Sequence, residues 1–92
     1  MTRDEQLLVR AMEECSEIAQ RFSKALVFGL DETQPEQPFS NRSRIMLEFH
    51  DLAAVMEMCG LNPRDLDDDL IRAKKAKVEK YLAYSAECGT LK

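Results

Sequence analysis

The amino-acid sequence predicts an all-α fold, an antiparallel helical bundle of three to four helices that is completed by oligomerisation. Three observations favour this fold class. Apolar residues recur at helical spacing in three long segments, a glycine follows each segment, and no segment alternates polar and apolar residues as a half-buried strand does. A chain of 92 residues builds one modest core, so we expect residues 1–92 to form a single domain.

The first predicted helix begins near Asp4, the expected N-cap, and ends at about Phe28, because Gly29 follows. We expect Cys15, which lies in its apolar stripe, to be a small buried residue. Residues 29–40 contain two prolines and predict a loop, and loops of this length often act as lids or binding loops. The apolar stripe consists of Leu8, Ala11, Cys15, Ile18, Ala19, Phe22 and Leu26.

The second predicted helix has Ser40 or Asn41 as its N-cap and ends at Cys59, before Gly60. A single loop joins it to the first helix, and such a helical hairpin packs antiparallel by default. Its core stripe consists of Ile45, Phe49, Leu52, Met56 and Cys59.

The third predicted helix opens with Asn62 as cap and Pro63 at its first position, can restart at Asp67, and ends near Gly89. It carries two apolar rows that lie roughly 120° apart around the helix. A three-helix monomer needs only one such face, so we expect a homo-oligomer. One row is Leu66, Leu70, Ala73, Tyr81 and Tyr84, and the other is Ile71, Val78 and Leu82.

Two pairs of carboxylates, Glu14-x-x-Glu17 and Glu48-x-x-Asp51, stand out on the first two helices. Measured from the centre of the apolar stripe, Glu14 lies roughly 85° and Glu17 roughly 145° to one side. Glu48 lies roughly 70° and Asp51 roughly 130° off, with the same rotational sense. In an antiparallel pair of helices, all four carboxylates then line one edge.

This acidic edge has two interpretations that the geometry alone leaves open. Neighbouring carboxylates repel each other unless a cation lies between them, and hard cations such as Mg²⁺ take oxygen ligands. Acids are also common on solvated helix faces, and Arg10 and Arg21 could neutralise the first pair. Glu13 lies almost opposite the apolar stripe, so we assign the first pair to Glu14 and Glu17.

Composition narrows the classes of function. A net charge of −4 disfavours a general binder of nucleic-acid polymers. The three cysteines lack the spacing of a zinc site or a disulfide framework. No apolar run reaches the ~20 residues that cross a bilayer, and the charged N-terminus is unlike a signal peptide. We therefore expect a cytoplasmic protein that has no membrane partner.

The acidic motifs and their surroundings resemble the MazG-like all-α nucleoside triphosphate pyrophosphohydrolases. The paired acids of that family are similar to Glu13-Glu14-x-x-Glu17 followed by Glu48-x-x-Asp51. The short phage and bacterial members are also similar in KAL-x-FG, at residues 24–29, and in N-x-x-R-I-x-x-E-x-x-DL-x-A, at residues 41–54. The resemblance covers about residues 5–84.

The resemblance implies a Mg²⁺-dependent enzyme, with Mn²⁺ as an alternative ion, whose metal ligands are Glu14, Glu17, Glu48 and Asp51. It implies hydrolysis of an NTP or dNTP between the α and β phosphates, to the monophosphate and pyrophosphate, by a homodimer or homotetramer. The catalytic candidates that orient or deprotonate the attacking water are Glu17 and Glu48. Substrate-binding candidates in the matched segments are Lys24 and Asn41.

The third helix adds two basic candidates. Lys77 falls within an apolar stripe, where a buried ammonium is costly unless it is paired. Either Lys77 reaches solvent, or it points with Lys74 toward the acidic edge and contacts substrate phosphates. Asp69 borders the same stripe as a fifth metal ligand or a partner for Lys77. His50, the only histidine, is expected on the surface.

Two other functions stay open from the sequence. One is a non-catalytic helical oligomer that retains the acidic edge as a cation-binding surface. The other is a small adaptor that binds another protein through the row of Ile71, Val78 and Leu82.

Overall fold

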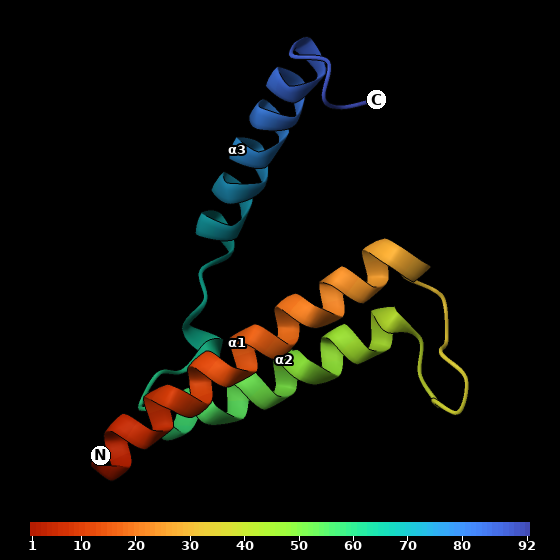
Figure 1. The fold of residues 1–92 in the computed structure, drawn as a ribbon. Coiled ribbons are helices and arrows are strands. Elements are labelled where there is room, and N and C mark those ends of the chain that lie inside the picture. The colour runs from red at the N-terminus through yellow and green to blue at the C-terminus, as the bar shows by residue number, and fades with distance from the viewer.

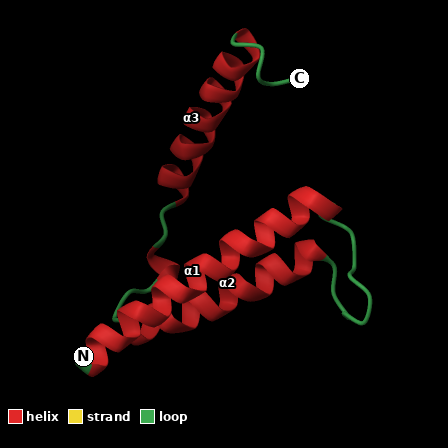
Figure 2. Ribbon diagram, in the orientation of Figure 1, coloured by secondary structure: helices red, strands yellow, loops and turns green.

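The computed structural model describes residues 1–92 and contains helices and connecting loops but no strand, which confirms the all-α class (Figures 1 and 2). Two helices form an antiparallel hairpin, and the third projects away from it (Figure 1). No helix is both long and apolar enough to span a membrane. The elements are α1 (Arg3–Phe28), α2 (Asn41–Met58), the single 3₁₀ turn η1 (Pro63–Asp65) and α3 (Asp68–Glu87).

The N-cap of α1 lies two residues before the predicted one. The N-cap is Thr2, whose hydroxyl accepts from the Glu5 backbone N–H at 3.2 Å. The Glu5 carboxylate accepts in turn from the Thr2 backbone N–H at 3.2 Å, which completes a capping box. The prediction of Asp4 as the cap was therefore wrong. Asp4 lies in the first turn, where a negative charge favours the helix N-terminus.

Helix α2 begins after Ser40, one of its two expected caps, and runs back along α1. The Ser40 hydroxyl accepts from the Ser43 backbone N–H at 3.2 Å. The buried contact between the two helices is small and consists of Ile18, Ala25 and Ile45. Beside these residues, the rings of Phe22 and Phe49 meet edge to face, with their centroids 6.5 Å apart.

The predicted apolar stripe of α1 is only partly covered, because α2 is the only helix that packs on α1 and it covers only part of the width of the stripe. Leu26 remains 88% exposed, and Leu8 is exposed as well. The expectation that Cys15 is buried was wrong for the same reason, since its side chain is exposed. The hairpin alone therefore leaves apolar surface on α1 that has no cover within the chain.

Helix α3 makes no packing contact with α1 or α2 (Figure 1). Asp67 is its N-cap and accepts from the backbone N–H groups of Asp69 at 2.7 Å and Leu70 at 3.2 Å. The prediction that the third helix restarts at Asp67 is confirmed, with the 3₁₀ turn before it. No apolar side chain of α3 is buried, and Leu70 is 72% exposed.

Candidate metal centre

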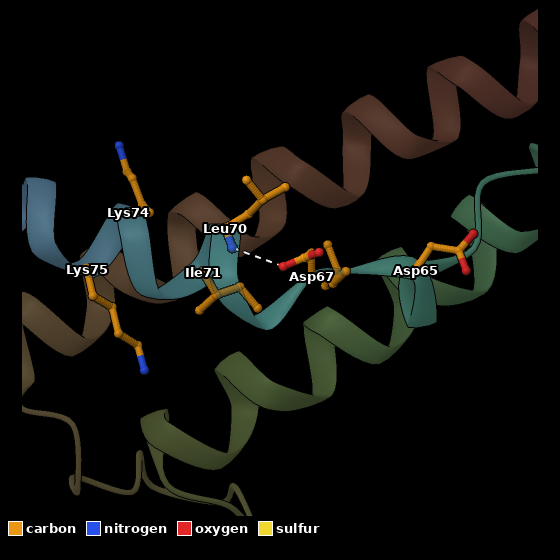
Figure 3. Close-up of a pocket in the computed structure, with 7 residues that line it drawn as sticks. Asp65, Asp67, Leu70, Ile71, Lys74 and Lys75 are labelled. Atoms are coloured by element: carbon orange, nitrogen blue, oxygen red, sulfur yellow. Dashed lines mark hydrogen bonds between the residues drawn. The ribbon is translucent and has the colours of Figure 1, made fainter.

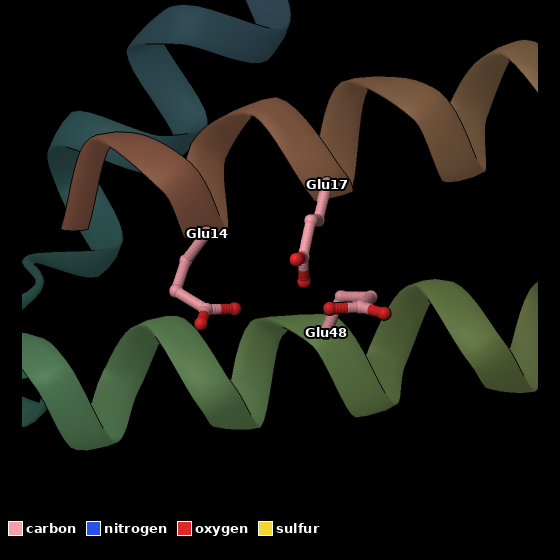
Figure 4. A group of neighbouring side chains, drawn as sticks. All are labelled: Glu14, Glu17 and Glu48. Carbon is pink, nitrogen blue, oxygen red and sulfur yellow. The ribbon is translucent and has the colours of Figure 1, made fainter. Parts of the chain in front are cut away.

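Three carboxylates from facing helices converge at the middle of the hairpin (Figure 4). Glu14 and Glu17 project from α1 toward α2, and Glu48 lies on α2 opposite them. One carboxylate oxygen of each lies within 4.8 Å of the others. A spacing of three on α1 places both glutamates over the same point, and antiparallel packing brings Glu48 to that level.

Asp51 lies near the group of three but does not form part of it. It is one turn along α2 from Glu48 and is exposed. Its charge nevertheless contributes to raising the pKa of both Glu14 and Glu48, so it belongs to the same electrostatic environment. No ion pair holds its side chain.

The carboxylates of the cluster disfavour each other's charge. Partial burial is the main reason that the pKa of Glu14 lies above its ordinary value, and repulsion by Glu17, Asp51 and Glu13 adds to it. Partial burial also raises the pKa of Glu48, followed by the charge of Glu17 and a hydrogen bond with it, and then by the charges of Asp51 and Glu14. Every contribution acts in the same direction, so the cluster lacks a neutralising group.

The oxygens of this cluster fit a hard cation. The Oε2 atoms of Glu14 and Glu48 are buried and have no hydrogen-bond partner, whereas buried polar atoms are normally paired. Neither arginine that could neutralise the first pair does so. Arg10 pairs instead with Glu13 at 3.4 Å, and Arg21 forms no ion pair. Carboxylate oxygens are the ligands that Mg²⁺ prefers, so the residues present suit that ion.

The predicted basic residues of α3 do not meet the cluster within one chain. Lys74 and Lys77 are exposed, on a helix that does not contact α1 or α2. Lys74 lines a groove of about 400 Å³ at the start of α3, together with Leu70 and Ile71 (Figure 3). Asp69, expected near Lys77, is exposed and pairs with Arg72 at 3.0 Å.

Asn41 holds the loop between α1 and α2. It is the most buried side chain of the protein, at 1% exposure. Its Nδ2 donates to the Gly29 carbonyl at 2.8 Å and to the Glu32 carboxylate at 2.9 Å, while its Oδ1 is buried without a partner. Both amide hydrogens are thus committed to the loop. Lys24, the other candidate in the matched segments, lies with its Nζ 5.9 Å from the centre of the Phe28 ring.

Two further contacts between the loop and α2 were not predicted as contacts. Arg42 pairs with Asp31 at 2.9 Å, and Arg44 donates to the Gln34 side chain at 2.9 Å. No spacing rule indicates them, because they join residues ten or more positions apart across an irregular loop. His50 is exposed, as expected, with its Nδ1 at 2.7 Å from the Met46 carbonyl.

Comparison of the chain with protein-family models, with curated proteins and with solved structures gave no match. The case for a function therefore rests on the sequence motifs and on the geometry of the helical hairpin.

Proposed function

We propose that the protein is a Mg²⁺-dependent nucleoside triphosphate pyrophosphohydrolase of the MazG-like type. It would cleave an NTP or dNTP between the α and β phosphates and release the monophosphate and pyrophosphate. The observation that carries this proposal is the convergence of Glu14, Glu17 and Glu48 with two buried oxygens unpaired. The residues that converge are three of the four acids in the motifs that resemble this family.

The roles of the carboxylates follow from their exposure. Glu14 and Glu48 are half-buried and carry the unpaired oxygens, so they are the principal candidates for holding the cation, with Asp51 beside them. Glu17 is exposed at the same point and can orient an attacking water as well as bind the cation. A bound Mg²⁺ would neutralise charge on the phosphates and acidify water. Mn²⁺ is the alternative ion.

The proposal includes a homodimer or homotetramer that completes a bundle of three to four helices. Support comes from α3, whose two apolar rows are exposed in the single chain, and from the uncovered stripe of α1. In such an assembly, α3 of one subunit packs on the hairpin of another. Lys74 and Lys77 would then be candidates for contacting substrate phosphates at a neighbouring acidic edge.

A second candidate function is a non-catalytic helical oligomer or adaptor. The observation that favours it is the exposed row of Ile71, Val78 and Leu82, which suits binding to another protein whether or not the acidic edge is catalytic. It predicts a folded protein that binds Mg²⁺ and turns over no nucleotide.

The test incubates the purified protein with Mg²⁺ and a panel of canonical and modified NTPs and dNTPs, and separates pyrophosphate from orthophosphate in the products. We expect pyrophosphate and a monophosphate in equal amounts. Glu48→Gln should lower kcat by about 100-fold or more, because it removes one of the converging carboxylates. Glu57→Gln, the same change at an exposed position of α2, is the control.

Two results would contradict the proposal. Orthophosphate as the first product would exclude cleavage between the α and β phosphates. Absence of turnover for every nucleotide, from a protein that stays helical and binds Mg²⁺, would favour the non-catalytic oligomer.

A further inference from the structure

The edge that carries the carboxylates continues toward the loop with two arginines. Arg21 follows Glu17 by four positions on α1, and Arg44 precedes Glu48 by four positions on α2. Both steps run toward the loop, because the helices are antiparallel (Figure 1). Each step rises about 6 Å along its helix, so the two arginines lie at a similar level, about one turn beyond the carboxylates.

Neither of these two arginines forms an ion pair with an acidic side chain, whereas three other arginines of the chain do. The Arg44 guanidinium donates to the neutral Gln34 side chain, and Arg21 has neither an ion pair nor a partner for its buried Nη1. Glu17 stands at the spacing of a favourable pair with Arg21, but no such pair forms. The arginine ion pairs of the structure are Arg10–Glu13, Arg42–Asp31 and Arg72–Asp69.

An unpaired guanidinium N–H in a half-buried position is unfavourable until an acceptor reaches it. A cation relieves the repulsion among the carboxylates, and an anion supplies the acceptor that the Arg21 guanidinium lacks. A metal-bound polyphosphate supplies both charges in one ligand.

We propose that Arg21 is a phosphate-binding residue that positions the phosphate chain of the nucleotide beside the carboxylate cluster. This inference rests on the proposed function and adds to it a residue outside the acidic motifs. The planar guanidinium can donate two parallel hydrogen bonds to phosphate oxygens, a geometry that lysine lacks. The Arg21 side chain as a whole is half-buried, so an anion can approach it from the solvent side even though its Nη1 atom is buried.

The experiment measures binding of pyrophosphate in the presence of Mg²⁺ by isothermal titration calorimetry, alongside binding of Mg²⁺ alone. Arg21→Gln should weaken pyrophosphate binding by about 10- to 100-fold, the range expected for a lost hydrogen bond to a charged group. Mg²⁺ alone should bind as well as before or slightly better, because a neighbouring positive charge is removed. Arg21→Lys should restore part of the affinity.

The control is Arg10→Gln, an identical change on the same helix at a residue that is paired with Glu13. It should leave pyrophosphate affinity unchanged. A purely structural role for Arg21 would lower Mg²⁺ binding and helix content together with pyrophosphate binding, and that result would overturn the inference. Equal pyrophosphate affinities for Arg21→Gln and Arg10→Gln would overturn it as well.

Failure of the inference and failure of the proposed function give different results. A wild-type protein that hydrolyses nucleotides while Arg21→Gln keeps full affinity overturns the role of Arg21 alone. A wild-type protein that binds pyrophosphate with Mg²⁺ but has no turnover overturns hydrolysis, and the role of Arg21 then stands if Arg21→Gln loses affinity. A wild-type protein that binds neither pyrophosphate nor nucleotide overturns both.

If Arg21→Gln does not fold, Arg21→Lys and Arg10→Lys replace the glutamine variants, since both keep the charge and the long side chain. Weaker pyrophosphate binding by Arg21→Lys alone supports the inference. Equal affinity for the two lysine variants overturns it.

Discussion

At the scale of single residues, we expect the charge of Glu48 to lower the stability of the metal-free protein and to raise that of the metal-bound protein. Without a cation its charge is disfavoured by burial and by Glu17, so Glu48→Gln should stabilise the metal-free protein by about 0.5 kcal/mol, the size of one relieved like-charge contact. With Mg²⁺ the same variant should lose most of the stabilisation that the ion gives the wild type. Thermal unfolding with EDTA and with Mg²⁺ measures both effects.

Glu57→Gln serves as the control, because it removes the same charge from an exposed position of α2 away from the cluster. Its unfolding temperature should respond to Mg²⁺ as the wild type does. Equal Mg²⁺ responses of Glu48→Gln and the wild type would contradict the assignment of Glu48 as a metal ligand.

The carboxylate cluster should also make the stability of the metal-free protein depend on pH. The folded state raises the pKa of Glu14 and Glu48 above the ordinary 4.5, so it binds their protons more tightly than the unfolded chain does. The stability that this provides is present below the ordinary pKa and is lost as the pH rises through the raised values. In EDTA, lowering the pH from neutral toward 4.5 should therefore favour the wild type relative to Glu48→Gln. Urea unfolding of both proteins at each pH isolates this difference, and a difference that does not change with pH would contradict it.

The sequence could predict that Glu14, Glu17 and Glu48 meet, because helical periodicity and antiparallel packing are enough to place them on one edge. The same reasoning placed Asp51 with them, and it could not show that the Asp51 side chain stays outside the group of three. It could not predict how the nearby arginines pair. Whether Arg10 bonds to Glu13 or to the motif acids depends on rotamers and on a few tenths of a kcal/mol. Nor could it predict that Cys15 is exposed, because the spacing of apolar residues does not show how much of the apolar stripe a packed helix covers.

At the scale of elements, Asn41 joins the loop to the start of α2. Asn41→Ala removes the hydrogen bonds to Gly29 and Glu32, and it should cost about 1–3 kcal/mol in the free energy of unfolding. Without these hydrogen bonds the loop should also open more often. The Arg42 amide reports this opening, because it donates to the Leu30 carbonyl within the same junction. Faster hydrogen exchange at the Arg42 amide, together with the denaturation midpoint, checks both expectations.

Arg42→Ala is the matched comparison for this junction. It breaks an exposed ion pair with Asp31, which is worth at most about 1 kcal/mol. An Asn41→Ala variant no less stable than Arg42→Ala would show that the buried amide does not hold the loop.

The element boundaries show what local sequence determines. Ser40, Asn62 and Asp67 cap the elements where the sequence places them, because a short polar side chain before an apolar run is a local signal. Several polar residues near the N-terminus, Asp4 among them, can cap α1. The reciprocal pair of Thr2 and Glu5 satisfies two donors, so it prevails over a single cap at Asp4.

At the scale of the whole molecule, the sequence indicated the surplus of apolar surface but not where the third helix lies. Its two apolar rows were readable from spacing, whereas its direction depends on the short connection through η1 and on whatever covers the rows. In the single chain nothing covers them, and only four residues of the protein are buried. So small a core is marginal for a chain of this length, which makes association the expected source of stability.

This expectation gives a test of assembly on α3. Val78→Glu places a charge in the row of Ile71, Val78 and Leu82, and it should weaken self-association at least about 30-fold, the equivalent of about 2 kcal/mol for one buried side chain. Ala76→Glu introduces the same residue on the opposite face of the helix, away from both apolar rows. Sedimentation velocity over a range of concentrations distinguishes the two variants. We expect the wild type and Ala76→Glu to remain oligomers at concentrations where Val78→Glu is a monomer of lower helicity. A wild type that is a stable, fully helical monomer would contradict the prediction, because α3 would then keep its helix with both rows in water.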